Sequence, residues 1–238
     1  MATTFRILII IVCLGQLGAL EAQQVTMFSN YIDNQFFYNP AATGAKPYGE
    51  IRGVFHQQWQ GIENAPVSQH LGYNQRLNSD PIGIGLQGFN DNAGQLNNLG
   101  ASVALAYHII PSDKLRLSIG FSGGVSRWTV DQENAILTDE SDVAVSMANS
   151  SSSLPLLNLG IQLKYSNFHL GVSSPQILET KADFTGESSE SENELQRHIF
   201  ATAGYFIPLS DKFGLEPQVH FRYFNTAPEQ LNLGMRAH

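Results

Sequence analysis

The segment NLGASVALAYHI, residues 98–109, has the alternation of a β-strand with two different faces. Successive side chains of a strand point to opposite sides, so its residues separate into two rows. One row contains Leu99, Ala101, Val103, Leu105 and Tyr107, and the other contains Gly100, Ser102, Ala104, Ala106 and His108. In a soluble sheet the apolar row faces a core, whereas in an outer-membrane barrel it faces lipid and the other row lines the interior.

The composition favours a weakly charged protein of one all-β domain. The chain has 238 residues, of which 42% are hydrophobic and only 14% are charged, against roughly 25% charged in an average soluble protein. The net charge of −8, with 13 scattered basic residues, argues against a nucleic-acid partner, because phosphate binding needs a concentrated field of Lys and Arg.

The first residues have the layout of a secretory signal. Arg6 precedes the apolar run ILIIIVCLGQLGAL, and cleavage is expected after Ala22, which predicts a signal peptide at 1–22. An uncleaved anchor is the alternative, but the run is shorter than the roughly 20 residues that span a bilayer as a helix. The only cysteine, Cys13, lies in this segment. The mature chain is therefore expected to have neither disulfides nor cysteine-based metal sites.

Alternating segments recur along the chain and predict about ten strands. They are 50–59, 67–77, 82–90, 97–109, 115–128, 154–165, 168–175, 197–208, 213–224 and 229–238. Every second connection between them is a tight turn, whereas the long acidic segments 129–153 and 176–196 both fall in the other set. Outer-membrane barrels show this asymmetry, with short turns in the periplasm and long loops outside the cell.

The inward rows of the predicted strands contain mostly Gly, Ser, Asn and Gln. A soluble sheet would cover its wet face with Lys and Glu, so these small residues favour a crowded, curved interior and place the Leu99 row in lipid. Tyrosines at or near strand ends fit an interfacial aromatic girdle. They are Tyr73, Tyr107, Tyr165, Tyr205 and Tyr223.

Three stretches resemble a known family. They are QFFYNPAATGA at 35–45, HQQWQGIENAPVSQ at 56–69 and GIGLQGFNDNAGQ at 83–95. Their order and spacing are similar to those of the PorP/SprF family of Bacteroidetes outer-membrane proteins, which belongs with type IX secretion and gliding motility. The matching positions are Asn39, Pro40, Gly44, Gln58, Trp59, Gly61, Pro66, Asn90, Asp91 and Gly94.

The same residues also have a local interpretation. Pro40 and Gly44 make a turn, Pro66 opens a strand, and Asp91 with Gly94 closes a hairpin loop. The resemblance in order and spacing covers residues 35–108. Beyond residue 108 only the alternation of strands and turns is similar to that of the family. Family members resemble barrels that continue past this point, whereas QLNLGMRAH runs into the terminus. We therefore expect a chain truncated at its C-terminus relative to the family.

The residues give little support to other functions. Four histidines, His70, His108, His169 and His220, fall in inward rows, yet no nucleophile elbow, HExxH, Walker loop or dinucleotide fingerprint is present, which argues against an enzyme such as a lipase. The acidic loops lack an EF-hand pattern and are interpreted as solvated surface loops. Inward charges could line a pore or fill the lumen with salt bridges. These are Arg116, Lys164, Arg222 and Arg236, opposed by Glu216.

The sequence thus predicts an all-β fold, an antiparallel transmembrane outer-membrane β-barrel. Its expected organisation is a signal peptide at 1–22, a periplasmic N-terminal arm at 23–49 and the barrel at 50–238. The resemblance implies a non-enzymatic role without cofactors or metals, anchoring or supporting secretion components or surface-exposed substrates. It also implies partners among type IX secretion or gliding proteins, a peptidoglycan-associated protein and a secreted surface protein. A general outer-membrane pore or transport barrel is the alternative.

Overall fold

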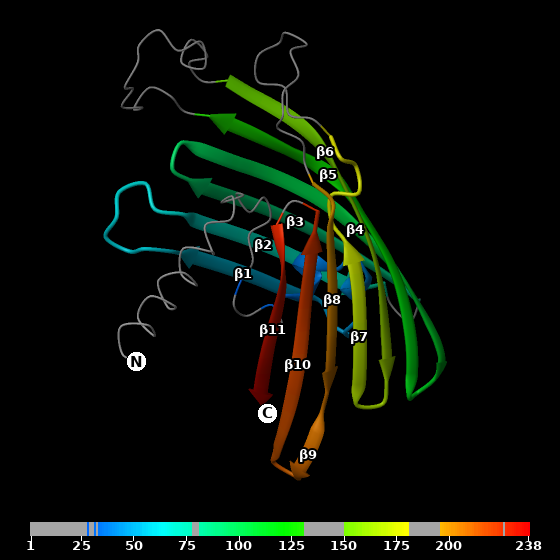
Figure 1. The fold of residues 1–238 in the computed structure, drawn as a ribbon. Helices are drawn as coiled ribbons and strands as arrows, with labels where there is room; N and C mark the ends of the chain where they lie inside the picture. Colours follow the sequence, from blue (N-terminus) through cyan, green and yellow to red (C-terminus); the bar gives the residue numbers. More distant parts are fainter. Residues whose placement is uncertain are drawn as a thin grey trace, which may run out of the picture.

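A single antiparallel sheet forms most of the protein (Figure 1). The computed structural model describes residues 28, 31, 33–77, 81–130, 150–180, 196–225 and 227–238. The expected signal peptide and most of both acidic segments lie outside these residues. Two short helical turns precede the sheet, α2 (Gln35–Tyr38) and η1 (Pro40–Ala42). The strands are β1 (Glu50–Gln57), β2 (Val67–Arg76), β3 (Ile82–Ala93), β4 (Leu96–Ser112), β5 (Leu115–Val130), β6 (Ser150–Tyr165), β7 (Phe168–Ser174), β8 (His198–Tyr205), β9 (Ile207–Ser210), β10 (Phe213–Phe224) and β11 (Ala227–Ala237).

The described residues form eleven strands rather than about ten, because the predicted strand 197–208 is interrupted at Phe206. The backbone N–H of Phe206 donates to the carbonyl of Asn167 at 2.9 Å, and the Asn167 side chain donates to the Phe206 carbonyl at 2.8 Å. The turn between β6 and β7 therefore holds the backbone of Phe206 out of the ladder, and β8 and β9 pair separately with β10.

The all-β, barrel-like fold is confirmed, although the sheet is not closed. The pairing order runs β1-β2-β3-β4-β5-β6-β7-β8-β10-β11, and within the described residues β1 and β11 remain edges that do not pair with each other. The sheet curls so that β7–β11 face the first strands across an interior, in which α2 and η1 lie (Figure 1). Among the described residues, no helix has the length and hydrophobicity needed to cross a lipid bilayer.

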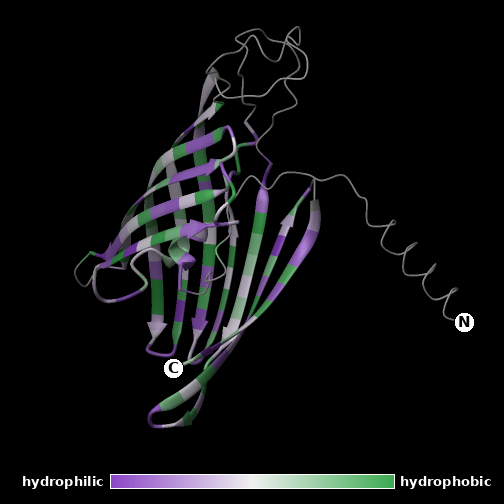
Figure 2. Ribbon diagram, turned by 90° about the vertical axis from the view of Figure 1, so that its left-hand side faces the viewer, coloured by the Kyte–Doolittle hydropathy of each residue, from purple (hydrophilic) through white to green (hydrophobic). Residues whose placement is uncertain are grey.

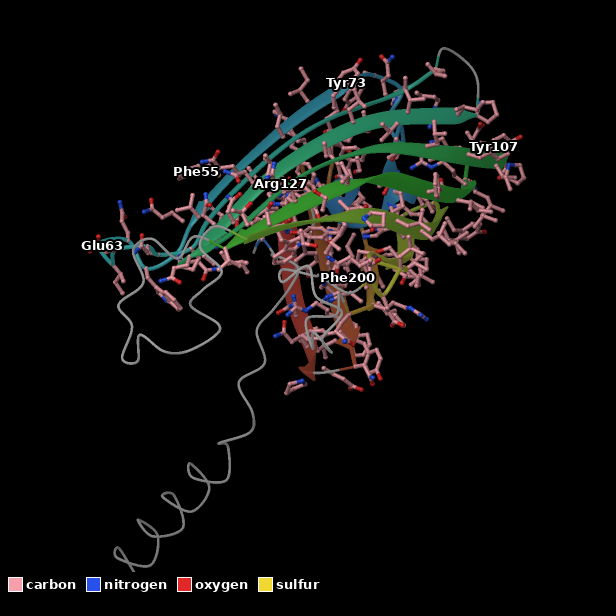
Figure 3. The ribbon with its side chains drawn as sticks, turned by 90° about the horizontal axis from the view of Figure 1, so that it is seen from above. Phe55, Glu63, Tyr73, Tyr107, Arg127 and Phe200 are labelled. Carbon is pink, nitrogen blue, oxygen red and sulfur yellow. The ribbon has the colours of Figure 1, made fainter. Side chains whose placement is uncertain are left out.

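The two rows of each strand have opposite environments. On β4, Leu99 is 55% exposed, whereas Ala104 on the other row is 1% exposed. Apolar and polar residues alternate along most strands in Figure 2. In Figure 3, Phe55, Tyr73 and Tyr107 lie on the outer surface of the curved sheet and Phe200 lies on its concave side. The predicted division between an apolar outer row and a small, polar inner row is therefore confirmed.

The connections also separate into two ends. We call the end with the turns 113–114, 166–167 and 211–212 the tight-turn end, and the other the loop end. The strand pairs β5–β6 and β7–β8, which the long segments connect, are both joined at the loop end. Four of the five tyrosines, Tyr73, Tyr107, Tyr165 and Tyr205, are exposed on the outer row toward the tight-turn end, and Tyr223 lies toward the loop end. The first four outline an aromatic band at the tight-turn end.

Candidate functional site

The N-terminal segment occupies the interior of the sheet. We call the described residues 28, 31 and 33–48 the plug. Asn39 ends α2 and caps η1, because its side-chain oxygen accepts the Ala41 N–H at 2.9 Å. Pro40 at the first position of η1 suits this start, since its missing N–H would have no partner there. The Asn39 amide also donates to the Ile161 carbonyl of β6 at 3.3 Å. The motif Asn-Pro thus fixes the plug to the sheet.

The plug rests on inner-row residues that have small side chains or none. Five of them are direct cross-strand neighbours on β3 to β7, and we call them the small-residue lane: Gly83, Ala106, Gly120, Gly160 and Ser173. A Cβ atom on Gly120 would collide with the backbone of Pro40 and Ala41, and one on Gly160 would collide with the Asn39 side chain. The small inner row therefore provides room for the backbone of η1.

Gly44 marks the point where the plug turns onto β2 and β3. Its φ of +64° is a left-handed conformation that glycine adopts without strain, and a Cβ atom there would lie 2.6 Å from the Cα of Gly83. Its N–H donates to the Asn74 side chain at 3.0 Å. The preceding carbonyl, that of Thr43, lies 2.9 Å from the Nε2 of His108, whose Nδ1 lies 2.7 Å from the Ser118 hydroxyl. The backbone polar groups of this turn are therefore bonded to the sheet.

Aromatic residues of the plug connect the two ends of the open sheet. Phe28, Tyr31, Tyr38 and Phe200 form one buried cluster. The ring of Phe28 packs edge-on against His70 of β2 at 4.7 Å, and that of Tyr31 lies 4.5 Å from His220 of β10. Burial raises the pKa of the Tyr38 hydroxyl, whose oxygen accepts the Phe28 N–H at 2.9 Å. The plug thereby bridges strands near both unpaired edges.

The interior next to Phe200 contains a buried cation, Arg222, that forms no ion pair with a described residue. The Arg222 side chain is 0% exposed, and none of its guanidinium nitrogens has a hydrogen-bond partner within the described residues. Its guanidinium carbon lies 5.2 Å from the centre of the Phe224 ring. The ring nitrogens of His198 and His220 are likewise buried without such a partner in the described part of the chain. This part of the interior is therefore tightly packed, but several of its buried polar groups lack hydrogen bonds to described residues.

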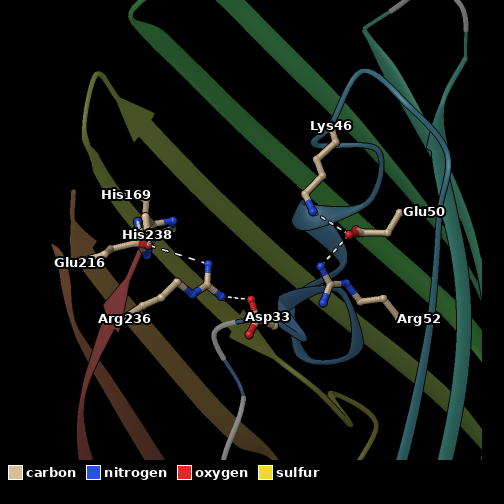
Figure 4. Close-up of polar contacts among 8 residues, drawn as sticks. All are labelled: Asp33, Lys46, Glu50, Arg52, His169, Glu216, Arg236 and His238. Atoms are coloured by element: carbon tan, nitrogen blue, oxygen red, sulfur yellow. Dashed lines mark hydrogen bonds and ion pairs between the residues drawn. The ribbon is translucent and has the colours of Figure 1, made fainter. Parts of the chain in front are cut away.

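A cavity of about 670 Å³ lies at the tight-turn end, where the plug reaches the mouth of the sheet. Its ion pairs form two groups (Figure 4). On one side, Glu50 accepts from Lys46 and from Arg52, each at 2.6 Å. On the other side, Arg236 of β11 pairs with Asp33 of the plug and lies 3.9 Å from Glu216. Glu216 also lies 2.6 Å from His238 and 3.4 Å from His169.

Several of the inward charges have partners inside the sheet or in the plug. Arg236 and Glu216 form a salt bridge, Arg222 is buried, and Arg116 donates to the Ala45 carbonyl of the plug. Plug residues line the cavity, among them Gln35, Phe36 and Ala42.

A comparison with family models gives the identity. The model of the type IX secretion system membrane protein PorP/SprF matches residues 20–238. The chain belongs to the PorP/SprF family. A search of curated proteins found no match. The resemblance that the three motifs suggested is thus confirmed over almost the whole chain of this PorP/SprF protein.

The structure divides the motif residues of this PorP/SprF protein into two groups. Asn39, Pro40 and Gly44 belong to the plug. The other seven, Gln58, Trp59, Gly61, Pro66, Asn90, Asp91 and Gly94, lie in or beside the hairpin loops β1–β2 and β3–β4 at the loop end. Figure 3 places Glu63 at the tip of the first of these loops.

The second group builds a pair of neighbouring hairpin loops. The N–H of Gln58 donates to the Pro66 carbonyl at 2.9 Å, which closes the first loop, and the N–H of Gly94 donates to the Asn64 carbonyl at 3.1 Å, which joins the two loops. Trp59 and Gly61 have positive φ angles and are exposed. Asn90 accepts from Asn97 at 2.8 Å, and Asp91 lies 3.2 Å from His70. These contacts account for the local turn chemistry of the motifs.

The pair of Ser118 and His108 lies beneath the Thr43 carbonyl, and each of the two residues is 1% exposed. No group of three or more His, Cys, Asp or Glu side chains in the described residues is placed to hold a metal ion.

Sequence reasoning missed the residues that receive the plug. The small-residue lane was recognised only as a sign of a crowded interior, and His108 only as one inward histidine among several. The available signal was the match between a backbone turn in the arm, NPAATG, and glycines at the same level on successive strands. Reading it requires the register of five strands, which a single sequence does not provide.

Proposed function

We propose that this protein is an outer-membrane barrel that anchors or supports components of the type IX secretion system, and that it acts neither as an enzyme nor as an open pore. The observation that carries the proposal is the occupied interior: the plug rests on the sheet backbone at Gly83, Gly120 and Gly160. A filled lumen suits a scaffold better than a transport barrel.

The proposed orientation follows from the two ends of the sheet. In outer-membrane barrels short turns face the periplasm and long loops face the outside of the cell. The tight-turn end, with its cavity and ion pairs, would then face periplasmic partners such as a peptidoglycan-associated protein. The loop end would meet gliding adhesins or secreted surface proteins. The route to this membrane would use the predicted signal peptide at 1–22, cleaved after Ala22.

Conductance separates the scaffold from the pore. The full mature chain in planar lipid bilayers is expected to give a closed trace, and a steady single-channel current from the unaltered protein would contradict the proposal. Gly120→Val displaces η1 from its position on β5 and is expected to produce current if the variant inserts. Gly123→Val is the matched control, because a Cβ atom there points away from the plug and meets only the Phe121 side chain at 3.5 Å.

Purification from native membranes tests the supporting role. A tagged wild-type protein is expected to retain type IX secretion or gliding proteins in mild detergent. Recovery without any secretion-system component would contradict the anchoring role. Hydrolysis of phospholipid by the purified protein, lost on His108→Ala, would instead favour an enzyme.

A further inference from the structure

Three cations converge on the mouth of the sheet from different strands. Arg76 of β2 donates to the carbonyls of Gly44 at 3.1 Å and Ala45 at 3.2 Å. Arg116 of β5 donates to the same Ala45 carbonyl. Lys164 of β6 is the direct cross-strand partner of Arg116. Like charges placed directly opposite each other destabilise a sheet, so Arg116 and Lys164 favour an anion beside them.

The acidic groups of the mouth already have cationic or histidine partners. Glu50 pairs with Lys46 and Arg52, and Asp33 pairs with Arg236. Glu216 is shared by Arg236, His169 and His238. Within the described residues, no carboxylate pairs with Arg76, Arg116 or Lys164. We call these three residues the mouth cations. Two of the mouth cations, Arg116 and Lys164, therefore line the cavity without an ion pair in the described residues.

The cavity beside the mouth cations is large enough for a ligand. Its volume is about 670 Å³, within the usual 300 to 1,000 Å³ of binding pockets. Arg116 and Lys164 line it together with polar groups of Gln162, Ser166 and Asn167. Carboxylates are good partners for this set, because guanidinium and ammonium groups form short, charge-assisted hydrogen bonds with them.

The direction of access favours a protein segment over a lipid. Lys164 belongs to the inner row, whereas its neighbour Tyr165 is exposed on the outer row. Lipid head groups surround the outer row, and they would have to leave the bilayer and enter the lumen to reach Lys164. A segment of a protein that approaches the tight-turn end reaches the cavity directly.

We propose that the mouth cavity binds an acidic peptide segment of a partner protein, with Asp or Glu side chains beside Lys164 and Arg116. This inference rests on the proposed function and specifies the chemistry by which the tight-turn end would hold its partner. Arg116 and Arg76 keep their contacts with the plug, so a bound segment would also lie against the plug at Ala45.

A binding assay with the full chain in lipid nanodiscs tests the proposal. The probe is a fluorescent peptide rich in Asp and Glu, compared with the same peptide carrying Asn and Gln. The acidic peptide is expected to bind at least about tenfold more tightly. Equal binding of the two peptides, or no binding of either, would overturn the proposal.

Two variants locate the site. Lys164→Gln removes a mouth cation that has no ion pair in the described residues, and is expected to weaken binding of the acidic peptide about tenfold. Lys114→Gln removes the same charge from the exposed turn before β5, outside the cavity, and is expected to leave binding unchanged. Equal effects of the two variants would overturn the site. Displacement of the peptide by phosphatidylglycerol vesicles, or by inorganic phosphate, would also overturn it in favour of a phosphate ligand.

The same variants separate this inference from the proposed function. If Lys164→Gln loses the partner that the wild type retains from native membranes, the mouth cations hold that partner. If Lys164→Gln keeps it and the acidic peptide does not bind, the inference fails while the anchoring role stands. If the wild type retains no partner, the anchoring role fails. The peptide assay then still tests whether the mouth cations bind an acidic segment.

Discussion

The plug contacts the two halves of the same sheet in different ways. Against β3 to β7 its backbone lies on the small-residue lane, and the polar groups of Asn39, Thr43 and Gly44 are hydrogen-bonded to the sheet. Against β8 and β10 it meets large side chains, and Arg222 and His220 lack hydrogen-bond partners within the described residues. The first half fixes the plug by shape and hydrogen bonding, whereas the second fixes it by apolar packing.

The two halves of the sheet should therefore tolerate different kinds of substitution. Added atoms should be harmful in the first half, because the plug backbone has no room to move away from them. In the second half the loss of apolar contact should be harmful, whereas the loss of an unbonded polar group should not be. Each variant below tests one half against the other, with the stability of the heat-modifiable folded form in urea as the common measurement.

The largest effect is expected from Gly120→Val. Its side chain would overlap the backbone of Pro40 and Ala41, so we expect little or no folded protein with the plug in place. Gly123→Val, three residues further along β5 and facing outward, should change stability by less than about 0.5 kcal/mol. A folded Gly120→Val protein with wild-type stability would show that η1 does not rest on β5.

Phe200→Ala should have the next largest effect. Phe200 is 2% exposed and contacts both Tyr38 and His220, so its truncation is expected to cost about 3 to 5 kcal/mol through lost contact and a cavity. Phe121→Ala on the outer row, where the side chain is 44% exposed, is the control and should cost much less. Similar urea midpoints for the two variants would contradict a packed second half.

The histidines compare the two halves most directly. His108→Leu leaves the Thr43 carbonyl without its partner, at an expected cost of about 1 to 3 kcal/mol. His198→Leu, in the second half of the sheet, removes a buried ring that forms no hydrogen bond with a described residue. It should cost less than about 1 kcal/mol. The reverse order of urea midpoints would remove the distinction between the halves.

The smallest changes in stability, of opposite sign, are expected from substitution of the arginines on β10 and β11. Arg222→Met removes a buried charge that has no ion pair in the described residues, and it should be neutral or stabilise the fold by about 1 kcal/mol. Arg236→Met breaks the pairs with Asp33 and Glu216, which are partly exposed, and should destabilise by up to about 1 kcal/mol. A large loss with Arg222→Met would mean that the guanidinium has a partner essential to the fold.

The sequence was sufficient for features that depend on neighbouring residues along the chain. The two rows of β4 follow from a period of two, and the separation of tight turns from long connections follows from their order. The tyrosines near strand ends follow from the same reading. These features need no knowledge of which strands meet.

The remaining features depend on contacts between residues far apart in sequence. The bond from Asn39 to the carbonyl of Ile161 joins the plug to β6, and the capture of Phe206 by Asn167 splits a predicted strand in two. The open edges at β1 and β11, bridged by Asp33 and the aromatic plug residues, are equally non-local. A pattern within one strand has no information about these partners.

Engineered disulfide formation tests the position of the plug most directly. Asn39 and Gly171 are suitable sites, because a Cβ atom on Gly171 would lie 3.1 Å from the Nδ2 of Asn39, and Cys13 can be replaced to remove the only natural thiol. In membranes from intact cells, Asn39→Cys with Gly171→Cys is expected to form an intramolecular disulfide under mild oxidation. Asn39→Cys with Gly88→Cys on the outer row should form none. A folded protein in which only the outer pair cross-links, or neither does, would contradict an occupied interior.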